Sequence, residues 1–338
     1  MDPWRILSRY RGVTLPLTTP DSEKALAEAK AGLVMGPRLA DALAMPVHWY
    51  YDREAMRRDY GVVREFLAPK NPHPDSILWR SSYVALNERG DILHEQTRFW
   101  GVRNVHYHQF LQAGENTLNL KLGNVLLRSL EACDGYDLDD YLERYVAFML
   151  TPGMHRDTYV EEYHRHFFTC HARGWKPRRC GGNDIHIGGL AHVGVLCSHF
   201  SGDEKAALAA LKRHVGFSHS EEVVEAAVAM TRMIFEVLRG GDLREAILKH
   251  GTRWISQRKV ADWSREPDEV VIGHRLSPAC YIRDAFAGSL YLAWKYADDF
   301  EKAAMANANL GGDNCHRGAV IGALIRPPVV SSFGELVD

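Results

Sequence analysis

The spacing of apolar residues constrains this chain more than any other sequence feature. Between residues 223 and 237 they recur at intervals of four, three, four and three, at Val223, Ala227, Met230, Ile234 and Val237. This spacing matches the 3.6-residue turn of an α-helix, so the five side chains share one face. Comparable patterns predict helices over residues 117–130, 138–150, 157–172, 279–296 and 300–307. The Thr19-Pro20 pair, followed by acidic residues, is typical of one more helix start.

Strand signals are confined to one stretch. Residues 76–100 hold two short runs rich in β-branched and aromatic residues on either side of residues 87–91, which predicts a hairpin or an extended loop. A proline-rich piece, residues 68–76, leads into it. The sequence shows no internal repeat and no long linker. We therefore predict one all-α domain over residues 1–338, with a loop or hairpin insertion at about residues 68–108.

Composition excludes several classes of function. The chain has 338 residues, 46% of them hydrophobic, which is enough for a large core. Lys and Arg total 41 against 43 Asp and Glu, without a long run of one sign, which argues against a nucleic-acid surface or a polybasic membrane patch. No stretch approaches the ~18 consecutive apolar residues of a membrane span. The six cysteines form no Cys-x-x-Cys pair, and the start MDPWRILSRYRG lacks a signal-peptide apolar run, so we expect a reduced, cytoplasmic protein.

Polar residues crowd around a Gly-Gly turn in the segment NANLGGDNCHRGAVIGALI, residues 307–325. Gly311 and Gly312 permit a positive φ or a close backbone approach, and a helix of small residues is predicted from Gly318 onward. A helix start offers free N–H groups and the positive end of the helix dipole. Polar side chains at such a place are suited to binding an anion, a metal or a sugar. The alternative is an ordinary loop-to-helix junction with Asp313 as its N-cap.

This segment resembles the closing motif of the ADP-ribosylglycohydrolase family, which includes ADP-ribosyl-arginine hydrolases, dinitrogenase-reductase-activating glycohydrolases and J1 crystallins. In that family Gly-Gly-Asp-Thr-Asp-Thr precedes a helix of small residues. Three further segments are similar to family motifs in the same order: AGLVMGPRLADALAMPVHW (31–49), GENTLNLKLGNVLLRSL (114–130) and GGNDIHIGGLAHVGVL (181–196). The resemblance covers about residues 28–326. It implies an all-α fold, an ADP-ribosyl-like or other small-molecule substrate, and two Mg²⁺ ions held by oxygen ligands.

The residues at the family's metal-binding positions differ in this chain. The family's Thr-Asp-Asp is Gly-Glu-Asn here (114–116), and its closing Asp-x-Asp-Thr is Asp-Asn-Cys-His (313–316). His48 stands where the opening motif has Glu. Mg²⁺ prefers octahedral oxygen coordination, and the two carboxylates that remain, Glu115 and Asp313, cannot easily neutralise two divalent ions. We therefore expect the standard binuclear Mg²⁺ centre to be absent. In its place we expect a divergent metal site with substituted ligands.

Three interpretations of this donor set stay open. In the inherited geometry the converging residues would be His48, Glu115, Asp313, Cys315 and His316. The set suits a transition metal such as Zn²⁺, Fe²⁺ or Mn²⁺, with Glu115, Asp313 and His316 as ligands. It also suits metal-free chemistry in which a carboxylate and an imidazole exchange protons near neutral pH. The third interpretation is a silent site that still binds a ligand.

The resemblance implies a hydrolase that cleaves a glycosidic or related bond, here a divergent one. We expect Glu115 or Asp313 to act as the base, with His316 and His48 as proton partners. Substrate contacts are predicted for Asn116, Asn183, Asp184, His186, Gly311, Gly312 and Cys315. The alternative is a catalytically silent relative that binds ADP-ribose, a nucleotide or a protein partner. The enzyme is favoured because most of the replacing residues are themselves chemically competent.

Two further groups of residues have predicted roles. Asp41 lies at helical spacing among apolar residues, so we expect a buried carboxylate that is bonded to its surroundings. Aromatic and imidazole rings between residues 79 and 108 are candidates for stacking on a base or sugar, namely Trp79, Trp100, His106, Tyr107 and His108. For the two tryptophans a place in the core is the favoured interpretation.

Overall fold

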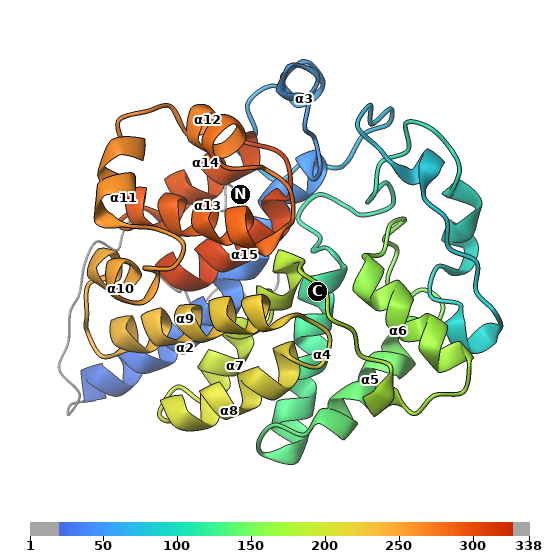
Figure 1. The fold of residues 1–338 in the computed structure, drawn as a ribbon, viewed down its shortest axis with the longest axis horizontal. Coiled ribbons are helices and arrows are strands. Elements are labelled where there is room, and N and C mark those ends of the chain that lie inside the picture. Colours follow the sequence, from blue (N-terminus) through green and yellow to red (C-terminus); the bar gives the residue numbers. More distant parts are fainter. Residues whose placement is uncertain (1–19, 327–338) are drawn as a thin grey trace.

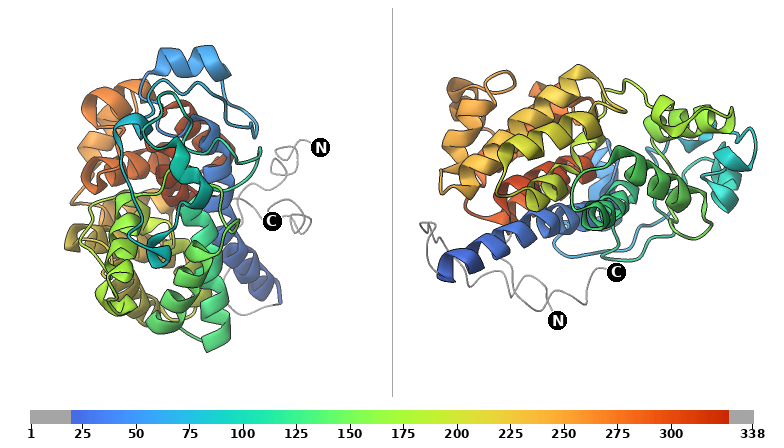
Figure 2. Two further views of the ribbon diagram at one scale, coloured as in Figure 1. Left: turned by 90° about the vertical axis from the view of Figure 1, so that its right-hand side faces the viewer. Right: turned by 90° about the horizontal axis from the view of Figure 1, so that it is seen from below.

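Two helices from distant parts of the chain lie side by side in the fold (Figures 1 and 2). The computed structural model describes residues 20–326. The first of the two helices, α2 (Pro20–Ala44), begins at the proline predicted for a helix start, while Thr19 lies outside the described residues. The second, α15 (Asn314–Ile325), begins four residues earlier than the predicted Gly318. It does so because the Asp313 side chain accepts from the His316 N–H and caps the helix at that point.

Small residues let α2 and α15 approach backbone to backbone. A Cβ atom added to Gly322 would lie 2.6 Å from the backbone nitrogen of Pro37 and within van der Waals contact of the Gly36 carbonyl. Nothing larger than glycine fits there without displacing one helix. The small-residue helix that the sequence predicts is thus the surface that allows this contact.

The other helices surround this pair. Helices α13 and α14 pack on α15, and α7 packs on α2, while α8, α9 and α10 form successive neighbours farther out (Figure 1). The remaining α-helices are α3 (Arg53–Tyr60), α4 (Leu118–Cys133), α5 (Leu138–Leu150), α6 (Glu162–Ala172), α7 (Val193–His199), α8 (Glu204–Val215), α9 (Glu221–Leu238), α10 (Leu243–His250), α11 (Gln257–Trp263), α12 (Asp268–Val270), α13 (Ile282–Lys295) and α14 (Phe300–Asn309). Short turns are η1 (Met45–Val47), η2 (Leu78–Arg80), η3 (Glu88–Gly90), η4 (His94–Phe99), η5 (Pro177–Arg179), η6 (Ile187–Leu190) and η7 (Val271–Arg275).

The predicted helical periodicity is confirmed in α9. Val223, Ala227, Met230 and Ile234 are buried in the main core, and Val237 packs against its edge. The all-α fold in a single domain is likewise confirmed: within residues 20–326 the β-type pairing consists of isolated bridges.

The predicted hairpin is wrong, and the loop alternative is observed. Between α3 and α4 the chain is irregular, with three short turns (η2 to η4) and no strand among these residues. Side chains accept the backbone hydrogen bonds that a second strand would accept in a hairpin. The Asn71 side chain accepts from the His106 N–H at 2.7 Å, and the Tyr107 hydroxyl accepts from the Ile77 N–H at 2.9 Å. Of the β-branched and aromatic residues there, Ile92 is buried, whereas Val84 and Trp79 are 81% and 40% exposed, so the core position favoured for Trp79 is wrong. β-propensity depends strongly on such context.

Helix α6 starts five residues later than predicted. Residues 157–161 are not helical, because the Thr158 N–H donates to the Tyr107 carbonyl at 2.9 Å and holds this stretch against the irregular segment. The two carboxylates at the ends of the stretch, Asp157 and Glu161, are buried. Asp157 lies beside His108, and Glu161 lies beside His316.

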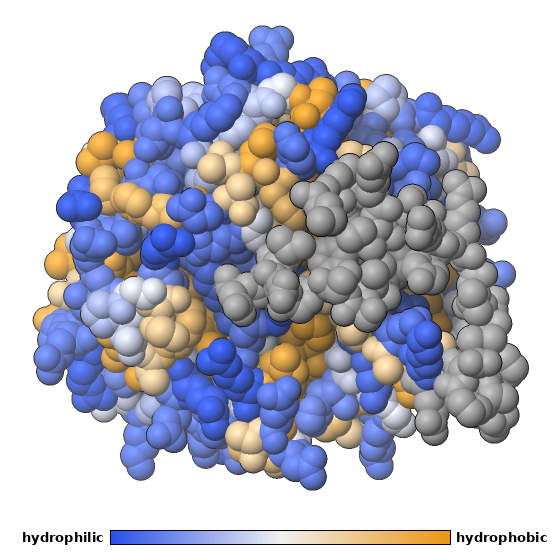
Figure 3. Space-filling view, turned by 180° about the vertical axis from the view of Figure 1, so that it is seen from behind, coloured by the Kyte–Doolittle hydropathy of each residue, from blue (hydrophilic) through white to orange (hydrophobic). Residues whose placement is uncertain are grey.

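The described helices are all too short or too polar to cross a membrane. On the face seen in Figure 3, hydrophobic residues occur in small groups between hydrophilic ones. All six cysteines, which lie within residues 20–326, are unpaired.

Candidate functional site

The Gly-Gly turn before α15 is held tightly from two sides. Gly311 and Gly312 have φ of +64° and +63°, which favours glycine. The Gly312 N–H donates to the Tyr50 carbonyl at 2.6 Å, and the Gly312 carbonyl accepts from the Trp49 N–H at 2.8 Å. On the other side, the Asp313 N–H donates to the Pro278 carbonyl at 2.8 Å. The turn therefore fixes the start of α15 against the segment that follows α2.

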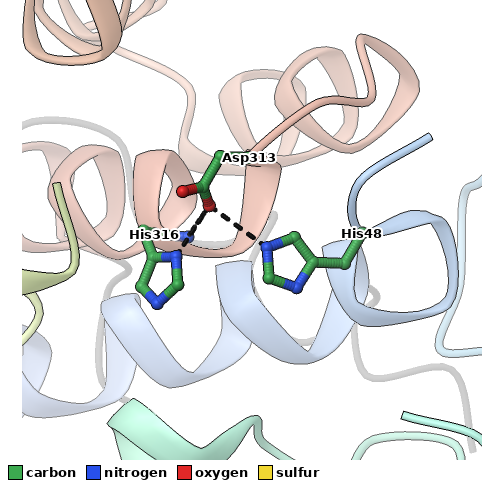
Figure 4. A group of neighbouring side chains, drawn as sticks. All are labelled: His48, Asp313 and His316. Atoms are coloured by element: carbon green, nitrogen blue, oxygen red, sulfur yellow. Dashed lines mark hydrogen bonds and ion pairs between the residues drawn. The ribbon is translucent and has the colours of Figure 1, made fainter. Parts of the chain in front are cut away.

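This arrangement brings His48, Asp313 and His316 together (Figure 4). Asp313 Oδ1 lies 3.1 Å from His48 Nε2 and 2.7 Å from His316 Nδ1. All three side chains are buried, with 0% or 1% of each residue exposed. The predicted convergence of these three residues is thus observed, although they lie beneath the surface and not in the open.

A second pair of residues lies behind His48. His48 Nδ1 is 2.8 Å from His108 Nε2, and His108 Nδ1 is 2.9 Å from Asp157 Oδ1. Lys121 lies 3.5 Å from the other oxygen of Asp157. The result is a buried line of two carboxylates and two imidazoles, Asp157–His108–His48–Asp313. His108, predicted as a candidate for stacking on a base or sugar, is instead buried and hydrogen-bonded between His48 and Asp157.

Glu161 occupies the far side of His316. Its Oε1 lies 3.4 Å from His316 Nε2 and accepts from the Asn119 side-chain amide at 3.0 Å. The second oxygen, Oε2, is buried and accepts no hydrogen bond from the described residues. Asn119 in turn accepts from the Tyr163 hydroxyl at 2.8 Å. Glu161 is therefore a fixed carboxylate with one oxygen free.

The electrostatics of the cluster follow from these contacts. Burial raises the pKa of the Asp313 carboxyl, but His316, His48 and His186 outweigh it and hold that pKa well below its usual range. In the same way His316 and other imidazoles overcome burial and lower the pKa of Glu161 to about 2. Burial also lowers the pKa of His316, yet the Asp313 and Glu161 carboxylates raise it to about 10. For His48 burial dominates and lowers its pKa to about 3.

A cleft of about 500 Å³ opens beside the cluster. Its walls carry five aromatic side chains and two arginines, namely Trp49, Tyr51, Tyr107, Tyr159, Tyr281, Arg80 and Arg165. Other polar or titratable groups lining it are Ser81, Glu161, Glu162, Asp184, His186 and Cys280. The cleft is thus aromatic and cationic on its walls, with carboxylates among its lining groups.

The loop carrying Asp184 and His186 is fixed from both sides. The Asp184 N–H donates to the Ser218 carbonyl at 3.1 Å, and its carbonyl accepts from the Ser220 N–H at 2.8 Å. His186 Nδ1 accepts from the Gly188 N–H at 2.8 Å, so its proton is on Nε2, 3.4 Å from Asp313 Oδ2. Both residues line the cleft, and substrate binding by them stays a prediction.

Glu115 does not join the cluster, so the expected convergence is wrong for this residue. Its Oε1 accepts from the Lys121 ammonium at 2.8 Å, and its Oε2 accepts from Arg156 at 2.6 Å and from the Gln112 N–H at 2.9 Å. Glu115 is absent from the groups of potential metal ligands found among the described residues.

Asn116 and Cys315 also point away from the cleft. Asn116 donates to Asp41 at 2.9 Å and to the Arg38 carbonyl at 2.8 Å. The Cys315 thiol is fully buried and faces the Asp41 carbonyl at 3.6 Å. Asp41 itself accepts from the Thr117 N–H and hydroxyl, as expected for a buried carboxylate that is bonded to its surroundings. These contacts hold α2, α4 and α15 together.

Three more predicted substrate-binding residues are placed outside the cleft. The Gly311 N–H donates to the Ala308 carbonyl, and the Gly312 N–H donates to the Tyr50 carbonyl. Both N–H groups therefore stabilise the turn and are not available to a substrate. Asn183 is exposed and does not line the cleft.

Sequence reasoning missed Glu161, Cys280 and Asp157. Glu161 lies in YVEEYHRHFF, where a carboxylate pair precedes an aromatic and His-rich helix. That concentration of titratable residues could have indicated a functional role for Glu161. Cys280 and Asp157 carry no local pattern, because tertiary contacts alone bring them to the site.

Comparison with known proteins identifies the architecture. The model of the family described as ADP-ribosylglycohydrolase matches residues 22–325. A solved structure titled "ADP-ribosylglycohydrolase-related protein complex" is 18% identical in sequence and superposes with a TM-score of 0.59. That match covers 93% of this chain and 94% of the other. At this identity the likeness concerns the fold. No curated protein sequence matches significantly.

Proposed function

Because the chain belongs to the ADP-ribosylglycohydrolase family, we propose that it hydrolyses a glycosidic bond of an ADP-ribosyl-like substrate in the cleft beside Glu161. The observation that carries the proposal is the state of Glu161. It is a buried carboxylate with a pKa of about 2, one oxygen free of hydrogen bonds, and a position in an aromatic, arginine-bearing cleft.

The family implies a pair of Mg²⁺ ions, and the residues present do not fit them. Glu115 is held by two cations, and the amide of Asn116 presents donors to Asp41 where a ligand would need an acceptor. The groups nearest Asp313 are imidazoles and a thiol, whereas Mg²⁺ requires near-octahedral oxygen coordination. We therefore assign the proposed hydrolysis to side chains of the protein.

Glu161 is suited to the two tasks that a glycosidic hydrolysis sets for a carboxylate. Cleavage develops positive charge at the anomeric carbon, and an ionised carboxylate nearby stabilises it. The same oxygen accepts a proton from the attacking water. The Nε2–H of His186 lies in the same cleft, where it can hydrogen-bond to the departing atom, and the proton that Glu161 takes from the water then passes to that atom. The pairing with His316 keeps Glu161 ionised through this sequence.

The walls of the cleft suit the rest of an ADP-ribosyl group. Arg80 and Arg165 supply positive charge for a diphosphate. Tyr51 and Tyr281 are 46% and 59% exposed, so their faces are free to stack on a base or sugar. The volume of about 500 Å³ is in the range of small-molecule sites.

The test compares two carboxylates: Glu115, which the sequence predicts as a candidate base, and Glu161, which the structure places in the cleft. Release of ADP-ribose from peptides ADP-ribosylated on arginine or serine is followed for Glu161→Gln and, as the matched control, Glu115→Gln. We expect Glu161→Gln to lower kcat by about 10²- to 10⁴-fold, and Glu115→Gln to leave it within a few fold. Circular dichroism and melting temperature establish that both variants fold. Equal losses in the two variants would contradict the assignment.

The second candidate function is that of a silent relative that binds the ligand without cleaving it. The burial of His48, Asp313 and His316 favours it, because these groups do not open to solvent. A thermal shift with ADP-ribose, together with no turnover of either peptide, would support this function and contradict the hydrolase proposal.

A further inference from the structure

The buried line from Asp157 to Asp313 has one hydrogen-bond donor too few. It contains three short gaps: Asp157–His108 at 2.9 Å, His108–His48 at 2.8 Å and His48–Asp313 at 3.1 Å. Two neutral imidazoles supply only two N–H groups. A carboxylate at each end can only accept, so one gap is left without a proton.

The tautomers indicate which gap this is. Asp157 accepts from Lys121 as well, and its carboxylate requires the proton of His108 on Nδ1. His108 Nε2 then accepts from His48 Nδ1, which leaves the Nε2 lone pair of His48 facing Asp313 Oδ1. A lone pair and a carboxylate oxygen 3.1 Å apart repel each other unless a cation lies between them.

His316 is arranged in the same way on the other side of Asp313. Its Nδ1 lies 2.7 Å from Asp313 Oδ1, and its Nε2 faces the Glu161 carboxylate at 3.4 Å. In metal sites a ligating imidazole typically turns its second nitrogen to a carboxylate or a carbonyl, which fixes the ring. For His316 the nearest partner of Nε2 is the Asn119 side-chain amide at 2.7 Å, which also donates to Glu161 at 3.0 Å. For His48 the carboxylate of Asp157 is reached through His108.

The donor atoms are already at coordination spacing. The ligand atoms of His48, Asp313 and His316 all lie within 4.8 Å of one another. A metal with bonds of roughly 2.0–2.1 Å separates adjacent ligand atoms by about 3 Å, close to the observed 3.1 Å and 2.7 Å. Two imidazoles and one carboxylate, with positions left open, are typical of Zn²⁺ or Fe²⁺ and not of Mg²⁺.

We propose that His48 Nε2, an oxygen of Asp313 and His316 Nδ1 bind one divalent first-row transition-metal ion. The ligand set differs from the one that the sequence predicts, since His48 takes the place of Glu115. The free oxygen of Asp313, Oδ2, accepts no hydrogen bond among the described residues and points to the side of His186 and Cys280. His186 and Cys280 in turn line the cleft, so this oxygen points to the side on which the cleft lies.

Metal binding is tested on the whole chain without turnover, so its result is separate from that of the hydrolase assay. Protein stripped with a chelator and dialysed is titrated calorimetrically with Zn²⁺ and, separately, with Mg²⁺. We expect one Zn²⁺ per chain and no comparable binding of Mg²⁺. Loading with Co²⁺ should give visible d–d bands without the near-ultraviolet band of a thiolate ligand.

Variants assign the ligands. His48→Gln should lose the stoichiometric Zn²⁺ site, whereas His155→Gln, a buried histidine outside the cluster, should keep it. His108→Ala removes the partner that orients His48 and should weaken Zn²⁺ binding by about 10- to 100-fold.

Three results would overturn the proposal: no stoichiometric Zn²⁺ in the wild type, unchanged binding in His48→Gln, or a thiolate band with Co²⁺. The first would mean that a proton, and not a metal, fills the gap beside Asp313. If His48→Gln does not fold, the wild-type titration and the Co²⁺ spectrum decide the question by themselves.

Discussion

The crossing of α2 and α15 makes Gly322→Ala the most informative substitution for the stability of this fold. The added methyl group would lie 2.6 Å from the Pro37 nitrogen and inside van der Waals contact of the Gly36 carbonyl. Carbon atoms in ordinary contact are about 3.5–4.0 Å apart. The obstructing atoms belong to the backbone, so no side chain can rotate away, and one helix has to move by about 1 Å.

The magnitude follows from two opposing effects. In a helix interior alanine is favoured over glycine by about 1 kcal/mol, which by itself would raise the free energy of unfolding. Overpacking a close contact costs about 1–3 kcal/mol, occasionally more, and here the contact is rigid on both sides. We expect the clash to dominate and Gly322→Ala to lower the free energy of unfolding by about 2 kcal/mol or more.

Gly123→Ala in α4 is the matched control. Its methyl group would lie 3.6 Å from His192 and 3.8 Å from Val195, which is ordinary contact. Helix propensity should then raise the free energy of unfolding by about 0.5–1 kcal/mol. Urea denaturation of both variants, followed by circular dichroism, measures the difference. A Gly322→Ala midpoint at or above that of the wild type would refute the backbone contact between α2 and α15.

One change of pH and two substitutions test which buried polar groups stabilise the fold. Burial lowers the pKa of His192 from 6.5 to about 4, so the unfolded chain takes up a proton first as the pH falls. His192 alone should therefore contribute a loss of up to about 3 kcal/mol between pH 6.5 and 4, and an unchanged pH dependence of the urea midpoint in His192→Gln would contradict it. Asp41→Ala leaves three donors of Asn116 and Thr117 without their acceptor and should cost about 3 kcal/mol or more in urea denaturation. Arg317→Lys keeps the buried charge but loses the fork that binds Asn307 and the Gly311 carbonyl, so calorimetry should show a lower melting temperature. An unchanged melting temperature would mean that the fork is not needed.

The fold was predictable because its signals are local and repeated. The apolar spacing in α9 specifies one buried face, and the small residues of α15 correspond to the close contact at Gly322. The hairpin prediction failed because β-propensity depends strongly on context. In residues 76–100 the backbone is bonded to side chains and not to a second strand, and Val84 and Trp79 stay exposed.

The site was predictable in part. His48, Asp313 and His316 converge because backbone bonds join the turn before α15 to the segment that follows α2. Glu115 was misplaced because its position in a motif does not record the partners that surround it, and here Lys121 and Arg156 hold it. Glu161 was missed because its place at the cleft depends on contacts that no short stretch of sequence contains.

The pairing of α2 with α15 also has a consequence for how the chain is made. His48 and Asp313 are 265 residues apart in the sequence, and α2 emerges from the ribosome long before α15 exists. Until then the apolar side of α2, with Leu33, Leu39 and Leu43, has no permanent partner. Closing so long a loop is slow, and exposed apolar surface invites aggregation or a chaperone. The nascent chain should therefore depend on protection of α2 during synthesis, and the functional site should form among the last steps of folding.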